Sequence, residues 1–155
     1  MNKFNPEILP LKGLPEIKFG DTIQQLEFVL GPPEETDELD DDFDPEGKTL
    51  VYHYWDKFHT FFFRGKGKPF LISIESDHLD TSIFDQKIFK MKEEEIVALF
   101  AENKFTDTDI EEEEWGEKRL SYEELAIDFY FEDGQLSTVN WSAELDDFGD
   151  VVLTD

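Results

Sequence analysis

The stretch AIDFYFEDGQLSTVNW, residues 126–141, decides the fold that the rest of the sequence can adopt. Apolar and polar residues alternate on both sides of Glu132-Asp133-Gly134, and an Asp-Gly pair between two such segments is a strong β-hairpin signal. The alternation places Phe129, Phe131 and Trp141 on one side of the hairpin. The stretch therefore predicts two antiparallel strands that share one apolar face.

Further segments with strand and helix periodicity lie upstream of this hairpin. An amphipathic helix is predicted from Asp21 or Thr22 to Leu30, because Gly31-Pro32-Pro33 cannot continue it. The apolar spacing predicts a second helix over 93–102. Ser82 to Phe89 is read as a short strand or an extended connector. The other predicted strands are 50–55, 59–64, 70–75 and 119–123.

The two halves of the chain match one another in apolar spacing. Leu50 and Tyr52 fall on Leu120 and Tyr122 at a shift of 70 residues, and later strands align at shifts of 68 and 67. The acidic segments 34–47 and 107–114 are read as loops in this alignment. We therefore predict an α+β fold with the helices packed on one face of the sheet. It forms one domain, 1–155, made of two tandem helix-plus-three-strand antiparallel repeats, 17–76 and 83–142, with an acidic C-terminal tail, 143–155.

Charge and composition restrict the partners of this chain. It has 39 acidic and 14 basic residues, a formal charge of −25, and 16 Phe, 4 Tyr and 3 Trp residues. Such a field repels nucleic acid and anionic membranes and attracts basic proteins or divalent cations. The absence of cysteine excludes disulfides and thiol catalysis. The first twelve residues lack the apolar core of a signal peptide, so a cytoplasmic location is the expectation.

Sequence motifs for catalysis are missing. The three histidines, His53, His59 and His78, have no metal-ligand spacing, and no serine lies in a nucleophile elbow. We therefore expect a protein that is not an enzyme and has no cofactor. The alternative is a small hydrolase or ligand-binding domain that uses His53 or His59 with acidic partners in a sheet pocket.

A third hypothesis is divalent-cation binding. Asp40, Asp42 and Asp44 match the start of a calcium loop, since alternate acids on a turn supply three of the oxygen ligands that calcium needs. Pro45 and Val51 stand where an EF-hand has glycine and glutamate. The pattern thus predicts weak calcium binding rather than an EF-hand.

The second face of the predicted sheet is the candidate interface. Alternation places aromatic, imidazole and small polar side chains on it, a composition typical of an interface core. A sheet face covered by a loop or by the tail is the alternative. The acidic run before Trp115 would add a docking surface for lysine and arginine. The interface candidates are His53, Trp55, Phe62, Tyr130, Trp115, Asp41, Asp42, Glu112 and Glu113.

A family resemblance rests on the helix that follows Gly20 and ends in Leu30-Gly31-Pro32-Pro33, followed by aromatic-rich strands. This pattern resembles one repeat of the β-lactamase inhibitor protein family and of related small outer-membrane lipoprotein domains. The second half, 83–141, resembles small acidic bacterial immunity proteins. The resemblance implies binding through a concave aromatic sheet face. The predicted function is an immunity or inhibitor protein that binds a basic protein such as a nuclease.

Overall fold

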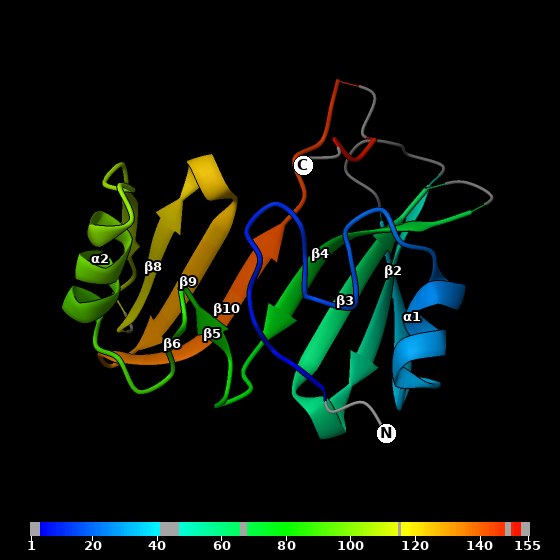
Figure 1. The fold of residues 1–155 in the computed structure, drawn as a ribbon, viewed down its shortest axis with the longest axis horizontal. Coiled ribbons are helices and arrows are strands. Elements are labelled where there is room, and N and C mark those ends of the chain that lie inside the picture. The colour runs from blue at the N-terminus through cyan, green and yellow to red at the C-terminus, as the bar shows by residue number, and fades with distance from the viewer. Residues whose placement is uncertain (1–3, 41–46, 66–67, 115, 148–149, 153–155) are drawn as a thin grey trace.

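The described sheet has eight antiparallel strands in the order β1-β2-β3-β4-β10-β9-β8-β7 (Figure 1). The computed structural model describes residues 4–40, 47–65, 68–114, 116–147 and 150–152. The strands are β1 Glu35–Asp40, β2 Lys48–Tyr54, β3 His59–Arg64, β4 Phe70–Ser76, β7 Asp109–Glu112, β8 Glu117–Tyr122, β9 Ile127–Glu132 and β10 Gln135–Ser142. The other elements are α1 Ile23–Leu30, α2 Glu93–Glu102, the 3-10 turns η1 Trp55–Lys57 and η2 Glu123–Leu125, and the small hairpin of β5 Ser82–Ile83 with β6 Gln86–Lys87.

The predicted α+β arrangement of helix-plus-three-strand repeats is wrong. Antiparallel strands dominate the described chain, which has two α-helices, and each helix is followed by four strands of one continuous sheet. The additional strands are β1 and β7, which lie in the two segments expected to be loops. Both are edge strands of the sheet.

The edge strands were missed for a physical reason. Every described residue of β1 and of β7 is exposed, so neither strand shows the apolar alternation that marks a half-buried strand. Leu39 and Ile110 are their only apolar residues. Acidic side chains on an edge strand also discourage pairing with another chain.

The two helices begin and end as their sequences predict. Thr22 caps α1, since its hydroxyl accepts from Gln25 N at 3.2 Å while Gln25 Oε1 accepts from Thr22 N at 2.7 Å. Gly31 ends the helix with φ 80°, and its N–H donates to Glu27 O. In α2, Phe100 stacks on Tyr122 of β8 with ring centroids 4.1 Å apart. No helix in the described ranges is long and apolar enough to cross a membrane.

One face of the sheet forms the hydrophobic core with the helices. Phe61 and Phe63 of β3 are fully buried, as are Phe129 of β9 and Trp141 of β10. Phe129 and Trp141 were predicted to share one face, and their burial confirms it. Tyr54 also lies on this face, where its hydroxyl donates to Gly31 O at 2.8 Å and ties β2 to the end of α1.

A bulge changes which residues of β4 face the core. Phe62 pairs with Ser73 but Phe63 pairs with Leu71, so Ile72 is the extra residue between them. Leu71 is therefore fully buried, whereas Ile72 is only partly buried. Ile72 O accepts from Ala143 N at 2.8 Å, just beyond β10.

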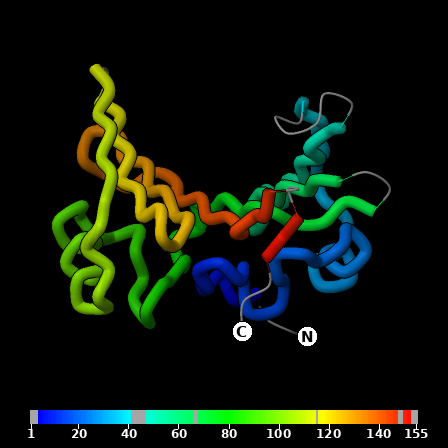
Figure 2. Tube along the Cα trace, turned by 90° about the horizontal axis from the view of Figure 1, so that it is seen from above, coloured from blue at the N-terminus to red at the C-terminus, as the bar shows by residue number. Residues whose placement is uncertain are grey.

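The N-terminal segment covers the centre of the sheet on the same side as the helices. Its apolar residues Ile8, Leu14, Ile17 and Phe19 belong to the core. Ile8 N donates to Ser82 O at 2.7 Å, which joins the segment to β5. The core is therefore covered by α1, the N-terminal segment, α2 and the segment 82–89, which buries Ile83, Ile88 and Phe89 (Figures 1 and 2).

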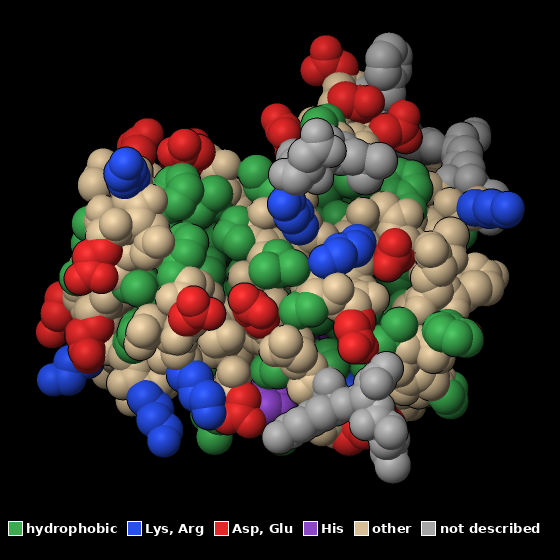
Figure 3. Space-filling view, in the orientation of Figure 1, with side chains coloured by type: hydrophobic (Ala, Val, Ile, Leu, Met, Phe, Trp, Pro, Cys, Tyr) green, Lys and Arg blue, Asp and Glu red, His purple; other side chains and the backbone are tan. Residues whose placement is uncertain are grey.

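The sheet is bent into a trough whose open side faces away from the helices. Figure 2 shows the hairpins β1–β2 and β7–β8 rising at the two ends, with the helices and the N-terminal segment below. On the helix-bearing side, acidic side chains are spread over the surface and Lys and Arg lie among them (Figure 3). The described chain places no helix over the open side (Figure 2).

Phe61 and Phe62 provide a direct test of which face is covered. Phe61 is fully buried among the core aromatics, whereas the neighbouring Phe62 lies on the open face and is partly exposed. Phe61→Ala should lower the free energy of unfolding by about 3–5 kcal/mol, and Phe62→Ala by about 1 kcal/mol or less. Urea unfolding measures both. Equal losses would mean that a further part of the chain covers the open face.

Candidate functional site

A cleft of about 450 Å³ lies where the open face meets the η1 turn. Thr60 of β3 and Glu75 of β4 are directly paired across the sheet, and Thr138 of β10 lies nearby on the same lining. The cleft therefore occupies the central strands, where the two halves of the sheet meet. Its lining residues are Trp55, Phe58, His59, Thr60, Glu75, Ser76, Asp77 and Thr138.

Two carboxylates in this cleft have raised pKa values. Burial is the main cause for Glu75, and the negative charge of Asp77 adds to it. Partial burial likewise raises the pKa of Asp77, whose side chain stands at the exposed end of β4. Within the described ranges, neither carboxylate makes an ion pair with a lysine or arginine. The cleft thus holds two carboxylates that lack a lysine or arginine partner in the described ranges, although His53 lies near Glu75 and His78 lies near Asp77.

Aromatic side chains form the outer edge of the cleft. Trp55 and Phe58 are 51% and 53% exposed, which is unusual for side chains of this size. The η1 turn holds them in place: Phe58 N donates to Trp55 O at 3.2 Å, and Phe58 O accepts from Asp77 N at 3.1 Å. Phe58 itself has a left-handed backbone conformation with φ 54°.

The η2 turn has the same backbone conformation with different side chains. Ala126 stands where Phe58 stands in η1, with φ 53°, and Glu123 corresponds to Trp55. The residues before the two turns, Tyr54 and Tyr122, also match, with φ −112° and −116°. The two exposed aromatic side chains thus belong to one of two equivalent turns.

His53 fixes the position of Trp55. The two rings are stacked with centroids 4.3 Å apart and an interplanar angle of 11°. His53 Nε2 lies 2.8 Å from Asp37 Oδ2, and its Nδ1 lies 3.2 Å from Thr60 Oγ1. Both nitrogens of the imidazole are therefore engaged, which holds the ring against the indole.

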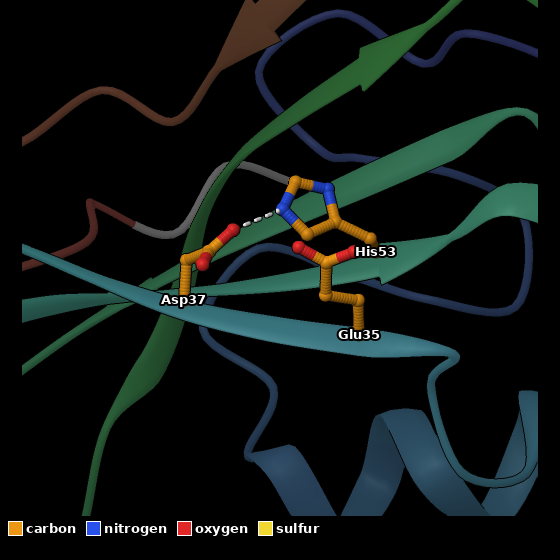
Figure 4. A group of neighbouring side chains, drawn as sticks. All are labelled: Glu35, Asp37 and His53. Atoms are coloured by element: carbon orange, nitrogen blue, oxygen red, sulfur yellow. Dashed lines mark hydrogen bonds and ion pairs between the residues drawn. The ribbon is translucent and has the colours of Figure 1, made fainter.

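Glu35, Asp37 and His53 also form a group of metal-type donors. Both carboxylates extend from β1 toward the imidazole on β2 (Figure 4). One donor atom from each residue lies within 4.8 Å of the others. Two carboxylates and an imidazole suit divalent ions such as zinc or manganese better than calcium, which prefers oxygen ligands.

His59 is a structural histidine rather than a reactive one. Its Nδ1 donates to Lys57 O at 2.7 Å, and its ring packs edge-on against Phe4 with centroids 4.8 Å apart. Burial lowers the pKa of His59 to about 4. Its Nε2 is sealed from solvent and has no hydrogen-bond partner in the described ranges. A nitrogen without solvent access cannot exchange protons with a substrate in the cleft.

The edge strands place further acidic residues on both rims of the open face. On β1, Asp40 pairs with Lys48 at 2.8 Å. On β7, Asp109 and Glu111 both pair with Arg119 of β8, at 3.3 and 3.0 Å. These pairs leave additional exposed carboxylates on both strands.

The structure brings together some of the predicted interface residues and separates others. His53 and Trp55 are in contact, and Phe62 and Tyr130 lie on the same open face. Glu112 and Glu113 lie at the β7 edge, away from the cleft lining. Of the proposed calcium ligands, Asp40 is paired with Lys48. Asp41, Asp42, Asp44 and Trp115 lie outside the described residues.

Several residues of the site were not predicted. Alternation along β4 places Glu75 on the same face as Ser73, so its position could have been read from the sequence. The positions of Phe58 and Asp77 depend on the η1 turn. The left-handed residue of this turn is Phe58 rather than a glycine, so the sequence gives no signal for the turn. Glu35 and Asp37 were hidden because β1 was read as a loop.

The pH dependence of stability should report the buried state of His59. Its pKa is about 6.5 when unfolded and about 4 when folded, so the stability that it contributes is present above pH 6.5 and lost as the pH falls toward 4. The loss amounts to as much as about 3 kcal/mol. Urea unfolding of wild type and His59→Phe at several pH values measures it. The difference between the two proteins should change across this window, and a constant difference would contradict a neutral, buried His59.

Comparison with known proteins gives no match for this chain, whether with protein-family models, with curated proteins or with solved structures. The resemblances to inhibitor and immunity proteins therefore remain predictions from sequence. The geometry of the open face and its cleft is the basis for the function proposed below.

Proposed function

We propose that this chain is a non-enzymatic protein-binding module that holds a basic protein partner in the trough of its sheet. The observation that carries the proposal is the open face itself. It bears the exposed Trp55 and Phe58 beside the carboxylates of Glu75 and Asp77, which have no lysine or arginine counterpart in the described ranges.

Charge and aromatic side chains would have separate roles in binding. The formal charge of −25 and the acidic strands β1 and β7 on both rims would accelerate encounter with a basic partner. The aromatic side chains near the centre would then supply the buried contact, because Trp and Tyr dominate the energetics of protein interfaces. His53 prepares this contact by holding Trp55 in one orientation before the partner arrives.

The most specific form of this proposal is an immunity or inhibitor protein. A basic toxin such as a nuclease has the charge that this surface complements. Occupation of its active site by the trough would inhibit it. The charge and the open, aromatic-bearing sheet face support this form, which predicts that binding abolishes the partner's activity.

Affinity capture with matched variants tests the proposal. Wild type, Trp55→Ala and Phe28→Ala are used as baits with extract of the source cell; Phe28 is 92% exposed on α1, on the opposite side of the sheet. A basic protein should be retained by wild type and by Phe28→Ala. Its Kd should rise at least about tenfold with Trp55→Ala, and its association should slow with added salt.

Two results would contradict the proposal. One is the absence of any partner that distinguishes the two variants. The other is a partner whose association is indifferent to salt. Thermal unfolding of Trp55→Ala provides the control for folding, since a half-exposed side chain contributes little to the core.

A second candidate function, binding of a divalent transition ion, is favoured by the Glu35–Asp37–His53 group. The ion would replace the hydrogen bond between His53 Nε2 and Asp37. Thr60 would remain at Nδ1 as the outer partner that metal-bound imidazoles usually have.

Zinc titration monitored by thermal unfolding tests this candidate. Zinc at about a hundredfold excess over Kd should stabilise wild type by about 2.7 kcal/mol. His53→Ala should lose this effect and His78→Ala should keep it, because His78 lies outside the donor group. An equal response of the two variants would assign the effect to scattered carboxylates and remove the candidate.

A further inference from the structure

We infer that the cleft beside η1 receives the guanidinium group of an arginine side chain supplied by the basic partner. The inference rests on the proposed function and names the group that the trough recognises. The cleft combines three features: carboxylates without a lysine or arginine partner in the described ranges, exposed aromatic rings, and a half-open volume of about 450 Å³.

Glu75 and Asp77 supply the negative charge of the cleft. Glu75 lies on a central strand of the sheet, partly buried, and Asp77 lies two residues further on at the mouth of the cleft. Lys57, the lysine nearest in sequence to the aromatic residues of the cleft, does not pair with either carboxylate. Its Nζ pairs with Asp56 at 3.2 Å and lies 5.9 Å from the centre of the Tyr54 ring. A cation from outside would therefore meet two carboxylates with which no lysine or arginine in the described ranges pairs.

The aromatic side chains favour guanidinium over ammonium. Trp55 is stacked on His53, and half of its surface remains exposed beside Phe58. A planar guanidinium stacks on aromatic rings and sheds water more easily than a lysine ammonium, while its five N–H donors match two carboxylates. Both interactions are available in this one cleft.

The size and the polar lining agree with this ligand. The volume of about 450 Å³ lies at the lower end of the roughly 300–1,000 Å³ typical of ligand pockets. Thr60 and Thr138 place hydroxyl groups on the lining. A single long side chain from a partner therefore fits better than a folded segment would.

Protonation should compete with arginine. Burial raises the pKa values of Glu75 and Asp77, the charge of Asp77 raises that of Glu75 further, and a bound cation would lower both again. Arginine should consequently bind more weakly as the pH is lowered through the raised pKa values, because the carboxylates then become neutral.

The experiment uses the full chain, labelled with ¹⁵N, and L-arginine amide as the probe. Arginine amide should shift the Trp55 indole N–H resonance in a saturable manner. Citrulline amide, a neutral molecule of the same shape, should not. Glu75→Gln should weaken the arginine effect at least fivefold. Glu38→Gln removes the same charge from an exposed position on β1 and should leave the effect unchanged.

Each alternative outcome has a distinct meaning. Equal shifts with citrulline amide, no shift at all in folded wild type, or equal weakening by Glu75→Gln and Glu38→Gln would overturn the inference. Capture of a basic partner that depends on Trp55, together with no response to arginine amide, would leave the proposed function intact and reject only the arginine cleft. Circular dichroism of both variants confirms that they fold.

Discussion

The pairing of β4 with β10 is the interaction on which the described sheet depends. It joins four strands from the first half of the chain to four from the second, through a register of four residue pairs from Val139–Ser76 to Ser142–Ser73. The buried Trp141 reinforces this junction, because its indole N–H donates to Gly13 O at 3.0 Å. Gly13 is required there: its φ is 115°, and a Cβ would lie 2.5 Å from Ile17 O.

The junction also determines which surface of the central strands is left open. With α1, the N-terminal segment and α2 all on one side, the central strands have the trough as their other surface (Figure 2). Ser73, Asn140 and Ser142 form a hydrogen-bonded polar group there, with Ser73 Oγ 3.0 Å from Ser142 Oγ. The cleft lies at one end of these same central strands.

The sequence predicted the elements whose side chains meet the core and failed for those that do not. Both helices and the inner strands have apolar periodicity because one face of each is buried, and their predicted positions agree with the structure. The edge strands have no buried face and so no periodicity. The bulge at Ile72 was equally hidden, since an extra residue changes the register without changing the composition. On the open face, strand alternation predicted the positions of His53 and Phe62. The positions of Phe58 and Asp77 depend on the η1 turn, which the sequence did not predict.

Comparison of η1 with η2 shows which features of the turn are needed for its backbone conformation and which side chains are not. Backbone geometry is shared by η1 and η2, including a left-handed residue that is Phe58 in one and Ala126 in the other. Ala126 shows that this conformation needs no aromatic side chain. Leu125 of η2 is buried, whereas no described residue of η1 is. Trp55 and Phe58 are therefore about half exposed at positions where the turn itself does not require an aromatic side chain. An aromatic pair that the turn does not require, beside two carboxylates that pair with no lysine or arginine in the described ranges, supports the proposal of a ligand that uses both.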